Sequence, residues 1–403
     1  GLTLRHRQYG WKSFTGKRWR RMDLSYQRIR QKNRDTTLLL IPLVAILAKF
    51  IHLYMLPDKY YFDSWRLLTM LTGSKGMAAW GGYQSTVDFY KTINFFNWAT
   101  LTQWSIGLGI ILTPIAMIII SRTKEMEMRE CIFTLMIVGL LNIYVFSITK
   151  ETIQICFFFL VYLIIQLPLK NTLLKVIGCA LVFYWESTFY RSYYIIMAAM
   201  TIFMYLIFVW LRQREKIKRK HIVIIVVMCF AAVFAFFYAS QFVAHKDYVN
   251  ALNARDGTTE TNQGAETSIE NPIKVDGNLG IFMYDYVINA VRMMVPIELL
   301  FKDIYYLPFV IFQFFILYYY FKAIKNIKNL DDNMIVVVAC YSAYFFGSVV
   351  FEPDFGSWVR HEAATFPILQ LLAYKSNSYK NLEEKSEEKP KKKRVVIYET
   401  EDV

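Results

Sequence analysis

Apolar residues follow one another along this chain in long blocks that short charged connectors separate. Ten blocks approach the roughly 20 apolar residues that a helix needs to cross the ~30 Å hydrocarbon layer of a bilayer. They cover 36–56, 98–120, 131–148, 152–168, 173–189, 193–211, 221–243, 304–321, 334–352 and 362–374. The pattern predicts an all-α polytopic membrane protein with about ten transmembrane helices.

An eleventh apolar stretch, 286–301, differs from these blocks because it contains Arg292, Pro296 and Glu298. Charged side chains in the middle of a bilayer are costly, and irregular backbone there must be shielded from lipid. We therefore expect this stretch to form an interfacial or re-entrant helix on the outer side of the membrane.

The connectors determine which way the helices run. If the N-terminus lies inside and ten helices alternate, the inside segments are 1–35, 121–130, 169–175, 211–221, 322–333 and 375–403. These segments hold 33 of the 46 Lys and Arg residues and 15 of the 32 Asp and Glu residues, a net charge of +18, whereas the outside segments sum to −5. Cytoplasmic connectors of membrane proteins carry such an excess of positive charge. Both termini are therefore expected in the cytoplasm.

The same pattern divides the chain into a basic cytoplasmic arm (1–35), a membrane domain (36–374) and a charged cytoplasmic tail (375–403). The net charge of the whole chain, +14, then indicates orientation and not nucleic-acid binding. We expect the arm to contact the anionic lipids of the inner leaflet. With 55% hydrophobic and 19% charged residues, the composition excludes a disordered chain, a disulfide scaffold and most classes of soluble enzyme.

Motifs that bind metals or nucleotides do not occur in the sequence. The five cysteines are scattered through the apolar blocks, and there is no HExxH, outer DxD, P-loop or GxGxxG motif. We therefore expect no cofactor and no obligatory metal.

The two longest outer segments are 57–97 and 244–303. The second begins with a polar stretch of about forty residues, 244–285, and loops of that length are usually lids, binding loops or disordered. We interpret this stretch as a mobile outer lid or as one wall of a substrate groove.

In the first outer segment, Asp63 and Arg66 are three residues apart and share one face if 61–72 is helical. Aromatic residues surround them. An acidic residue near an outer helix end can act as general base for a sugar hydroxyl. The alternative is an amphipathic surface helix whose aromatics belong to the interfacial belt.

The segment before the last apolar block contains Asp354, Arg360 and His361. A guanidinium at the outer surface can hold a diphosphate through two parallel hydrogen bonds. His361 is the histidine best placed for catalysis or diphosphate contact. A plain salt bridge between Arg360 and Asp354 explains the pattern equally well, because ion-pair networks also produce such clusters.

Further ionisable residues lie at predicted outer helix ends. They are Lys150, Glu151, Glu186, Arg191, Arg292 and Glu298. For any one of them, snorkelling or a salt bridge is the better explanation. Together with Arg360, however, the basic residues of this set come from four separate helix ends on one side. A bundle could converge them into one anion site, with the acids supplying acid–base chemistry.

Four short stretches resemble elements of one family. The C-terminal FGSWVRHEAATFPILQLL is similar to the signature near the last helices of Wzy-type polysaccharide polymerases and of the EpsG-like proteins of capsule and exopolysaccharide clusters. FSITKETIQ resembles the turn between paired helices in that group, FYRSYY its Arg-Tyr-Tyr element, and YYFDSWR its acidic first outer loop. The stretches spread over residues 57–370. The polar second outer loop and the His361–Glu362 pair depart from the family pattern.

The resemblance implies a GT-C-like bundle that polymerises undecaprenyl-diphosphate-linked oligosaccharide units on the outer face of a bacterial plasma membrane, with a chain-length regulator and a flippase as partners. The diphosphate would be bound by Lys150, Arg66, Arg191, Arg292 and Arg360. Asp63 would deprotonate the acceptor hydroxyl, and His361 would assist the leaving group. Acidic support would come from Glu151, Glu186 and Asp354.

Two other classes of membrane protein remain open. A GT-C-type transferase would share the outer acids but add a single sugar. A flippase or exporter should place charges along the middle of the spans, where Lys49 is almost alone. A passive anchor or sensor would not need so many outer ionisable residues.

Overall fold

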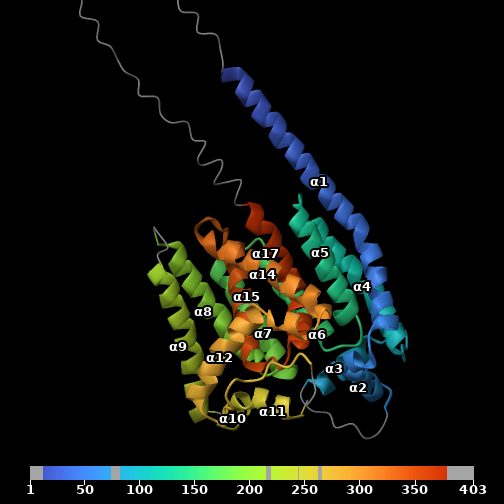
Figure 1. The fold of residues 1–403 in the computed structure, drawn as a ribbon, viewed down its shortest axis with the longest axis vertical. Coiled ribbons are helices and arrows are strands. Elements are labelled where there is room, and N and C mark those ends of the chain that lie inside the picture. The colour runs from blue at the N-terminus through green and yellow to red at the C-terminus, as the bar shows by residue number, and fades with distance from the viewer. Residues whose placement is uncertain (1–11, 74–81, 215–218, 244, 262–265, 379–403) are drawn as a thin grey trace, which may run out of the picture.

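The computed structural model describes residues 12–73, 82–214, 219–243, 245–261 and 266–378. The first eleven residues of the predicted arm and residues 379–403 of the predicted tail lie outside this part. Within it the chain is helical, and its one β-type pairing is an isolated antiparallel bridge between Ser268 and Asp354. The fold is that of an all-α membrane protein (Figure 1).

The helices alternate with short connections. In chain order they are α1 (Lys12–Phe50), α2 (Phe62–Leu71), α3 (Tyr83–Ile93), α4 (Leu101–Ser121), α5 (Met128–Leu140), α6 (Glu151–Gln166), α7 (Thr172–Phe189), α8 (Tyr194–Arg212), α9 (Arg219–Val243), α10 (His245–Leu252), α11 (Ala254–Thr261), α12 (Leu279–Met294), α13 (Glu298–Lys302), α14 (Leu307–Lys325), α15 (Asp332–Phe351), α16 (Phe355–Ala363) and α17 (Phe366–Ser378). Two π-helices, η1 (Ile51–Met55) and η3 (Leu141–Val145), extend α1 and α5. Three 3₁₀ turns are η2 (Asp58–Tyr61), η4 (Ile304–Tyr306) and η5 (Ile327–Asn329).

Eight helical stretches of the described chain are long and apolar enough to cross a membrane. They are Ser25–Met55, Leu101–Ser121, Met128–Val145, Thr172–Phe189, Tyr194–Arg212, Val223–Val243, Ile304–Lys325 and Asp332–Phe351. The two other predicted spans correspond to shorter helices. Helix α6 has 16 residues, about 24 Å at 1.5 Å per residue. The predicted block 362–374 is broken after α16, and its remaining helix, α17, has 13 residues.

The first helix is longer than its apolar block. Helix α1 begins at Lys12, although the predicted span begins at 36. The arm is rich in Lys, Arg and Gln, which are good helix formers, so its polar residues continue the helix although they cannot enter the hydrocarbon layer. In Figure 1 this part of α1 projects beyond the rest of the bundle.

The bundle has two chemically different ends. At the arm end, which holds 12–35 and the connectors 121–128, 167–172 and 326–332, ion pairs join distant segments. Arg30 Nη2 lies 2.5 Å from Glu127 Oε1, and Arg212 Nη1 lies 2.5 Å from Asp332 Oδ1. The predicted inside connectors thus meet at this end.

The other end, here called the loop end, holds the described residues of 57–73, 82–97, 146–151, 187–193, 245–261, 266–303 and 352–361. Helices α2, α3, α10 and α11 lie there, at the bottom of Figure 1. The predicted outer segments therefore gather at one end of the bundle, opposite the arm.

The centre of the bundle is α15. Its sequence from Met334 to Val350 is apolar or weakly polar around the whole circumference, and nearly every one of these side chains is buried. A helix that is apolar on all faces is stable only when other helices surround it. Because α15 ends at the loop end, it positions Glu352 and the segment that follows.

The described part of 244–285, the segment expected to form a mobile outer lid or a wall of a substrate groove, is partly helical. Helix α10 buries Tyr248 and Leu252, which are four residues apart and share one of its faces, and α11 buries Arg255. Arg255 Nη2 donates to the carbonyl of Val349 over 2.5 Å. The segment is thereby anchored to the end of α15.

The stretch 286–301, predicted as one interfacial or re-entrant helix, forms two elements. Helix α12 begins earlier, at Leu279, and ends at Met294; α13 begins after Pro296. Proline lacks the N–H that would continue the first helix, which explains the break. Neither element is among the helices long and apolar enough to cross a membrane in the described chain.

Close packing at one glycine gives a test of this arrangement. A methyl group on Gly107 of α4 would overlap the indole ring of Trp98, whereas one on Gly139 of α5 would lie 3.8 Å from Val44 Cγ1, an ordinary contact. Overpacking costs about 1–3 kcal/mol, and Gly to Ala in an unstrained helix gains up to about 1 kcal/mol. We expect Gly107→Ala to lower the Tm in detergent and Gly139→Ala to leave it equal or higher. Equal Tm values for the two variants would contradict this packing.

Candidate functional site

Charged side chains from four separated parts of the chain meet at the loop end. This group, here called the loop-end cluster, comprises Asp63, Lys150, Glu151, Arg191, Glu352, Arg360 and His361. They are placed by α2, by the start of α6, by the α7–α8 connection and by the α15–α16 connection. Solvent exposure decreases across the cluster, from half-buried side chains at Asp63 to buried ones at His361.

At the more exposed edge, Asp63 pairs with Lys150. Lys150 Nζ lies 3.0 Å from Asp63 Oδ2, and the hydroxyl of Tyr83 donates to the other carboxylate oxygen. Two cations flank the Tyr83 ring: the guanidinium carbon of Arg66 lies 4.4 Å and Lys150 Nζ 4.3 Å from its centroid. An aromatic face attracts such cations, so Tyr83 gathers Arg66 and Lys150 beside one carboxylate.

Lys150 is positioned by the turn that joins η3 to α6. The hydroxyl of Tyr90 donates to the carbonyls of Ser147 and Thr149, at 2.9 and 2.8 Å, and accepts the N–H of Thr149. Lys49 of α1 donates to the carbonyl of Phe146 and, over 3.2 Å, to Ser105 Oγ. These bonds satisfy backbone groups that an apolar bundle would otherwise leave unpaired. The turn is therefore fixed by side chains of α1 and α3.

The enclosed part of the cluster centres on His361. Its Nδ1 lies 2.5 Å from Glu352 Oε1, and its Nε2 lies 2.9 Å from Glu151 Oε1. Arg191 Nη2 is 3.1 Å from the same Nε2. One imidazole thus joins three segments that are distant in sequence.

Arg191 is fixed from several sides. Its Nη1 donates to the hydroxyl of Tyr193 over 2.9 Å and lies 3.5 Å from Gln154 Oε1, while its guanidinium carbon is 5.0 Å from the Tyr190 ring centroid. Glu186, fully buried near the end of α7, interacts electrostatically with it. Arg191 therefore connects the predicted acid Glu186 to the cluster.

Arg360 lies in the last turn of α16. Asp354 caps this helix by accepting the N–H of Ser357 over 2.7 Å and its hydroxyl over 2.8 Å, and Arg360 Nη2 donates to the same hydroxyl over 3.0 Å. Arg360 and Asp354 are thus linked through the hydroxyl of Ser357, which both side chains contact. Arg360 also interacts electrostatically with Glu151 and Asp63, which places it between the two parts of the cluster.

Neighbouring side chains shift the pKa values of Asp63 and His361 in opposite directions. Burial disfavours ionised Asp63, but Lys150 and the Tyr83 hydroxyl outweigh it, so the pKa of Asp63 lies below its usual value. Burial also disfavours the imidazolium of His361, yet Glu352 and Glu151 outweigh burial and Arg191 together and raise the pKa of His361. The site thus favours a carboxylate at Asp63 and a proton on His361.

Arg292 belongs to a different network. It holds Glu298 through two bonds, Nε to Oε2 at 2.8 Å and Nη2 to Oε1 at 2.7 Å, and donates to the carbonyl of Glu270 over 2.7 Å. These contacts all lie between Glu270 and Glu298, on and around α12 and α13. The structure therefore brings together Lys150, Arg191 and Arg360. Arg292 instead forms a salt bridge with Glu298, the alternative that the sequence also allowed.

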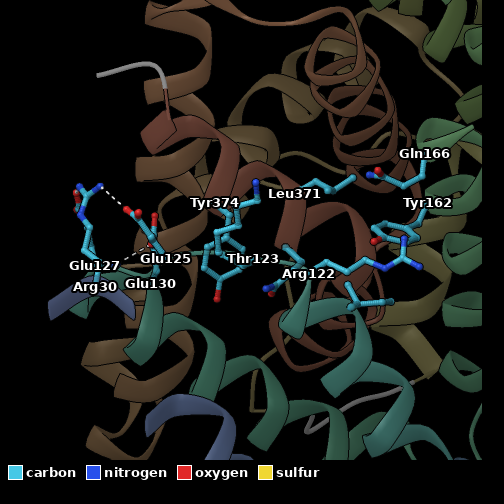
Figure 2. Close-up of a pocket in the computed structure, with 13 residues that line it drawn as sticks. Arg30, Arg122, Thr123, Glu125, Glu127, Glu130, Tyr162, Gln166, Leu371 and Tyr374 are labelled. Atoms are coloured by element: carbon cyan, nitrogen blue, oxygen red, sulfur yellow. Dashed lines mark hydrogen bonds and ion pairs between the residues drawn. The ribbon is translucent and has the colours of Figure 1, made fainter. Parts of the chain in front are cut away.

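A cavity of about 430 Å³ lies at the arm end, away from the cluster. Figure 2 shows Arg30, Glu127 and Glu130 on one side of it and Tyr162 and Gln166 on the other. Both signs of charge line it, and its glutamates already pair with Arg30 or cap α5. Among the described residues, no group of three or more His, Cys, Asp and Glu side chains is placed to hold a metal ion.

Several members of the site carried no assigned role in the sequence analysis. Tyr83, Gln154 and Lys49 lie in separate elements, and of the three only Gln154 falls within a stretch that resembles the family, FSITKETIQ. Glu352 stands nine residues before His361. This closeness in sequence was the one feature that could have indicated their pairing. Their roles come from the register of packed helices, which a hydropathy pattern does not specify.

Comparison of the chain with protein-family models, with curated proteins and with solved structures gives no match.

The environment of His361 predicts a pH-dependent stability. A histidine whose pKa is raised on folding stabilises the fold below its unfolded-state pKa, about 6.5, and loses that contribution as the pH rises through the folded value. We expect the Tm of His361→Gln to fall furthest below wild type at pH 6 and to approach it at pH 9. His245→Gln, at an exposed position of α10, is the control and should change the Tm little at either pH. A deficit for His361→Gln that grows with pH would show that the imidazole is neutral in the folded protein.

Proposed function

We propose that this protein is a polysaccharide polymerase of the Wzy-type or EpsG-like kind, with a GT-C-like bundle. It would transfer a glycan from a lipid diphosphate to a hydroxyl of the next lipid-linked oligosaccharide, on the outer face of a bacterial plasma membrane. The observation that supports this proposal is the convergence of Lys150, Arg191 and Arg360 with carboxylates and a histidine at one end of an apolar bundle. Cations at a membrane surface suit a diphosphate, and acids suit a hydroxyl.

In this proposal the bond between the anomeric carbon and the phosphate oxygen breaks, and the lipid diphosphate leaves with the electron pair. Arg360, Arg191 and Lys150 stabilise the negative charge as it develops. His361, whose pKa is raised by the two carboxylates beside its ring, adds positive charge on the same side when it carries both ring protons. The acceptor oxygen forms the new bond to the anomeric carbon, and its proton passes to Asp63.

The pair between Lys150 and Asp63 suits an ordered reaction. While Lys150 holds it, Asp63 is a weak base because its pKa is lowered. A diphosphate that binds Lys150 competes for the same ammonium and so returns basicity to Asp63. The base would thus become active only when the donor substrate is in place.

The proposal predicts the loss of polymer when cluster residues are changed. We expect Arg360→Ala and Asp63→Asn, each expressed in a deletion strain, to reduce polymer formation by about 10²-fold or more, as the loss of one charge-stabilising group does in other enzymes. Lys91→Ala, an exposed cation on α3 at the same end, is the matched control and should keep wild-type polymer. The readout is polymer length and amount at equal membrane levels of protein.

Full-length polymer from both cluster variants would refute the proposal. A product extended by one sugar instead of a ladder would identify the alternative, a transferase that adds a single residue. Substrate that accumulates on the inner leaflet of the variants would instead point to a transporter.

A further inference from the structure

A second cavity, entirely apolar, lies within the bundle close to the loop-end cluster. Its volume is about 350 Å³. It is lined by Ile196, Ala199, Met200 and Phe203 of α8, by Ala232, Val233, Ala235, Phe236 and Phe237 of α9, and by Phe346 and Val350 of α15. We call it the α8–α9 crevice.

The crevice lies in the half of the bundle nearest the loop end. Its α8 residues begin two positions after the helix starts at Tyr194, and Val350 stands one residue before α15 ends. Ala235 and Phe236 are exposed, so the crevice reaches the apolar surface of the bundle. In a membrane, a chain of lipid could therefore enter it from the side.

One aromatic pair stands next to the crevice lining in sequence and contacts the charged cluster. Tyr193 stacks on Phe351 with ring centroids 4.5 Å apart, and these residues stand beside lining residues on α8 and α15. The Tyr193 hydroxyl accepts a hydrogen bond from Arg191, whose other guanidinium nitrogen lies 3.1 Å from His361 Nε2. The Tyr193–Phe351 pair thus links the helix ends that line the crevice to Arg191.

This arrangement is complementary to an amphiphile with a hydrocarbon chain and an anionic head. We infer that the α8–α9 crevice holds the hydrocarbon chain of a polyprenyl diphosphate, while Arg191 contacts its diphosphate beyond the Tyr193–Phe351 pair. The inference rests on the proposed function and adds to it the place of the chain. Apolar contact along the chain would supply affinity, and the cations would select the head.

Adjacent alanines on α9 provide a matched pair of variants. Ala232 lines the crevice, whereas Ala231 is exposed and does not line it. Ala232→Trp would fill the space that the chain needs, and Ala231→Trp would add the same ring on the outer face. Arg191→Gln removes the contact with the head without touching the crevice.

The test measures binding of undecaprenyl diphosphate, farnesyl diphosphate and inorganic diphosphate to the purified full chain in detergent. For the unchanged protein, affinity should rise at least about tenfold from inorganic to farnesyl diphosphate. Ala232→Trp should weaken the binding of undecaprenyl diphosphate at least about tenfold more than Ala231→Trp does. Both variants should bind inorganic diphosphate with the affinity of the wild type. Retained binding of inorganic diphosphate shows that the variants are folded.

Each contrary result has a distinct meaning. Equal binding of undecaprenyl diphosphate by the two tryptophan variants, or equal affinity of the unchanged protein for inorganic and farnesyl diphosphate, would overturn the crevice assignment and leave the proposed function standing. Failure of all three diphosphates to bind wild type, or an Arg191→Gln variant that binds them undiminished, would count against the proposed function itself. If phosphatidylglycerol displaces undecaprenyl diphosphate at equal concentration, the crevice is a general lipid site and the inference is overturned.

Discussion

A charge removed from water must be paired, and this constraint governs the loop end of the molecule. His361, Glu151, Glu352 and Arg191 are all enclosed by helices, where an unpaired ion would cost several kcal/mol. Each therefore requires the others. Glu352 directly follows α15, α6 begins at Glu151, and the α7–α8 connection presents Arg191. The imidazole of His361, on α16, therefore sets the relative register of these helices. The positions of Lys150 and Arg360 follow from that register.

Charge pairing divides the cluster into a fixed, enclosed part and a part that a ligand can reach. Its enclosed half has its charges matched by neighbours, whereas its outer half keeps Lys150 and Asp63 within reach of water. Their side chains are 19% and 26% exposed, so an anionic ligand can compete for Lys150 without dismantling the enclosed half. The bonds from Tyr90 and Lys49 hold the turn behind Lys150 while that exchange takes place.

Hydropathy alone was sufficient for the helical class and for which segments share an end, because both depend on long apolar blocks and on their alternation. It was insufficient where polar sequence is helical, as in α1 before residue 36 and in α10 and α11. It also missed the break inside the block 362–374, because apolar character does not reveal where a helix ends. For the site, the sequence placed Asp63, Lys150, Arg191 and Arg360 at one end. It could not separate Arg292, whose partner Glu298 lies six residues away, since local and long-range ion pairs look alike in a sequence.

The length of α1 has a consequence for how other proteins would meet this one. Residues 12–35 continue the same helix, and 24 residues of α-helix extend about 36 Å. The first turns of α1 therefore lie beyond the other helices of the bundle (Figure 1). A protein that binds those turns would meet them about 36 Å along the helix from the residue where the predicted span begins.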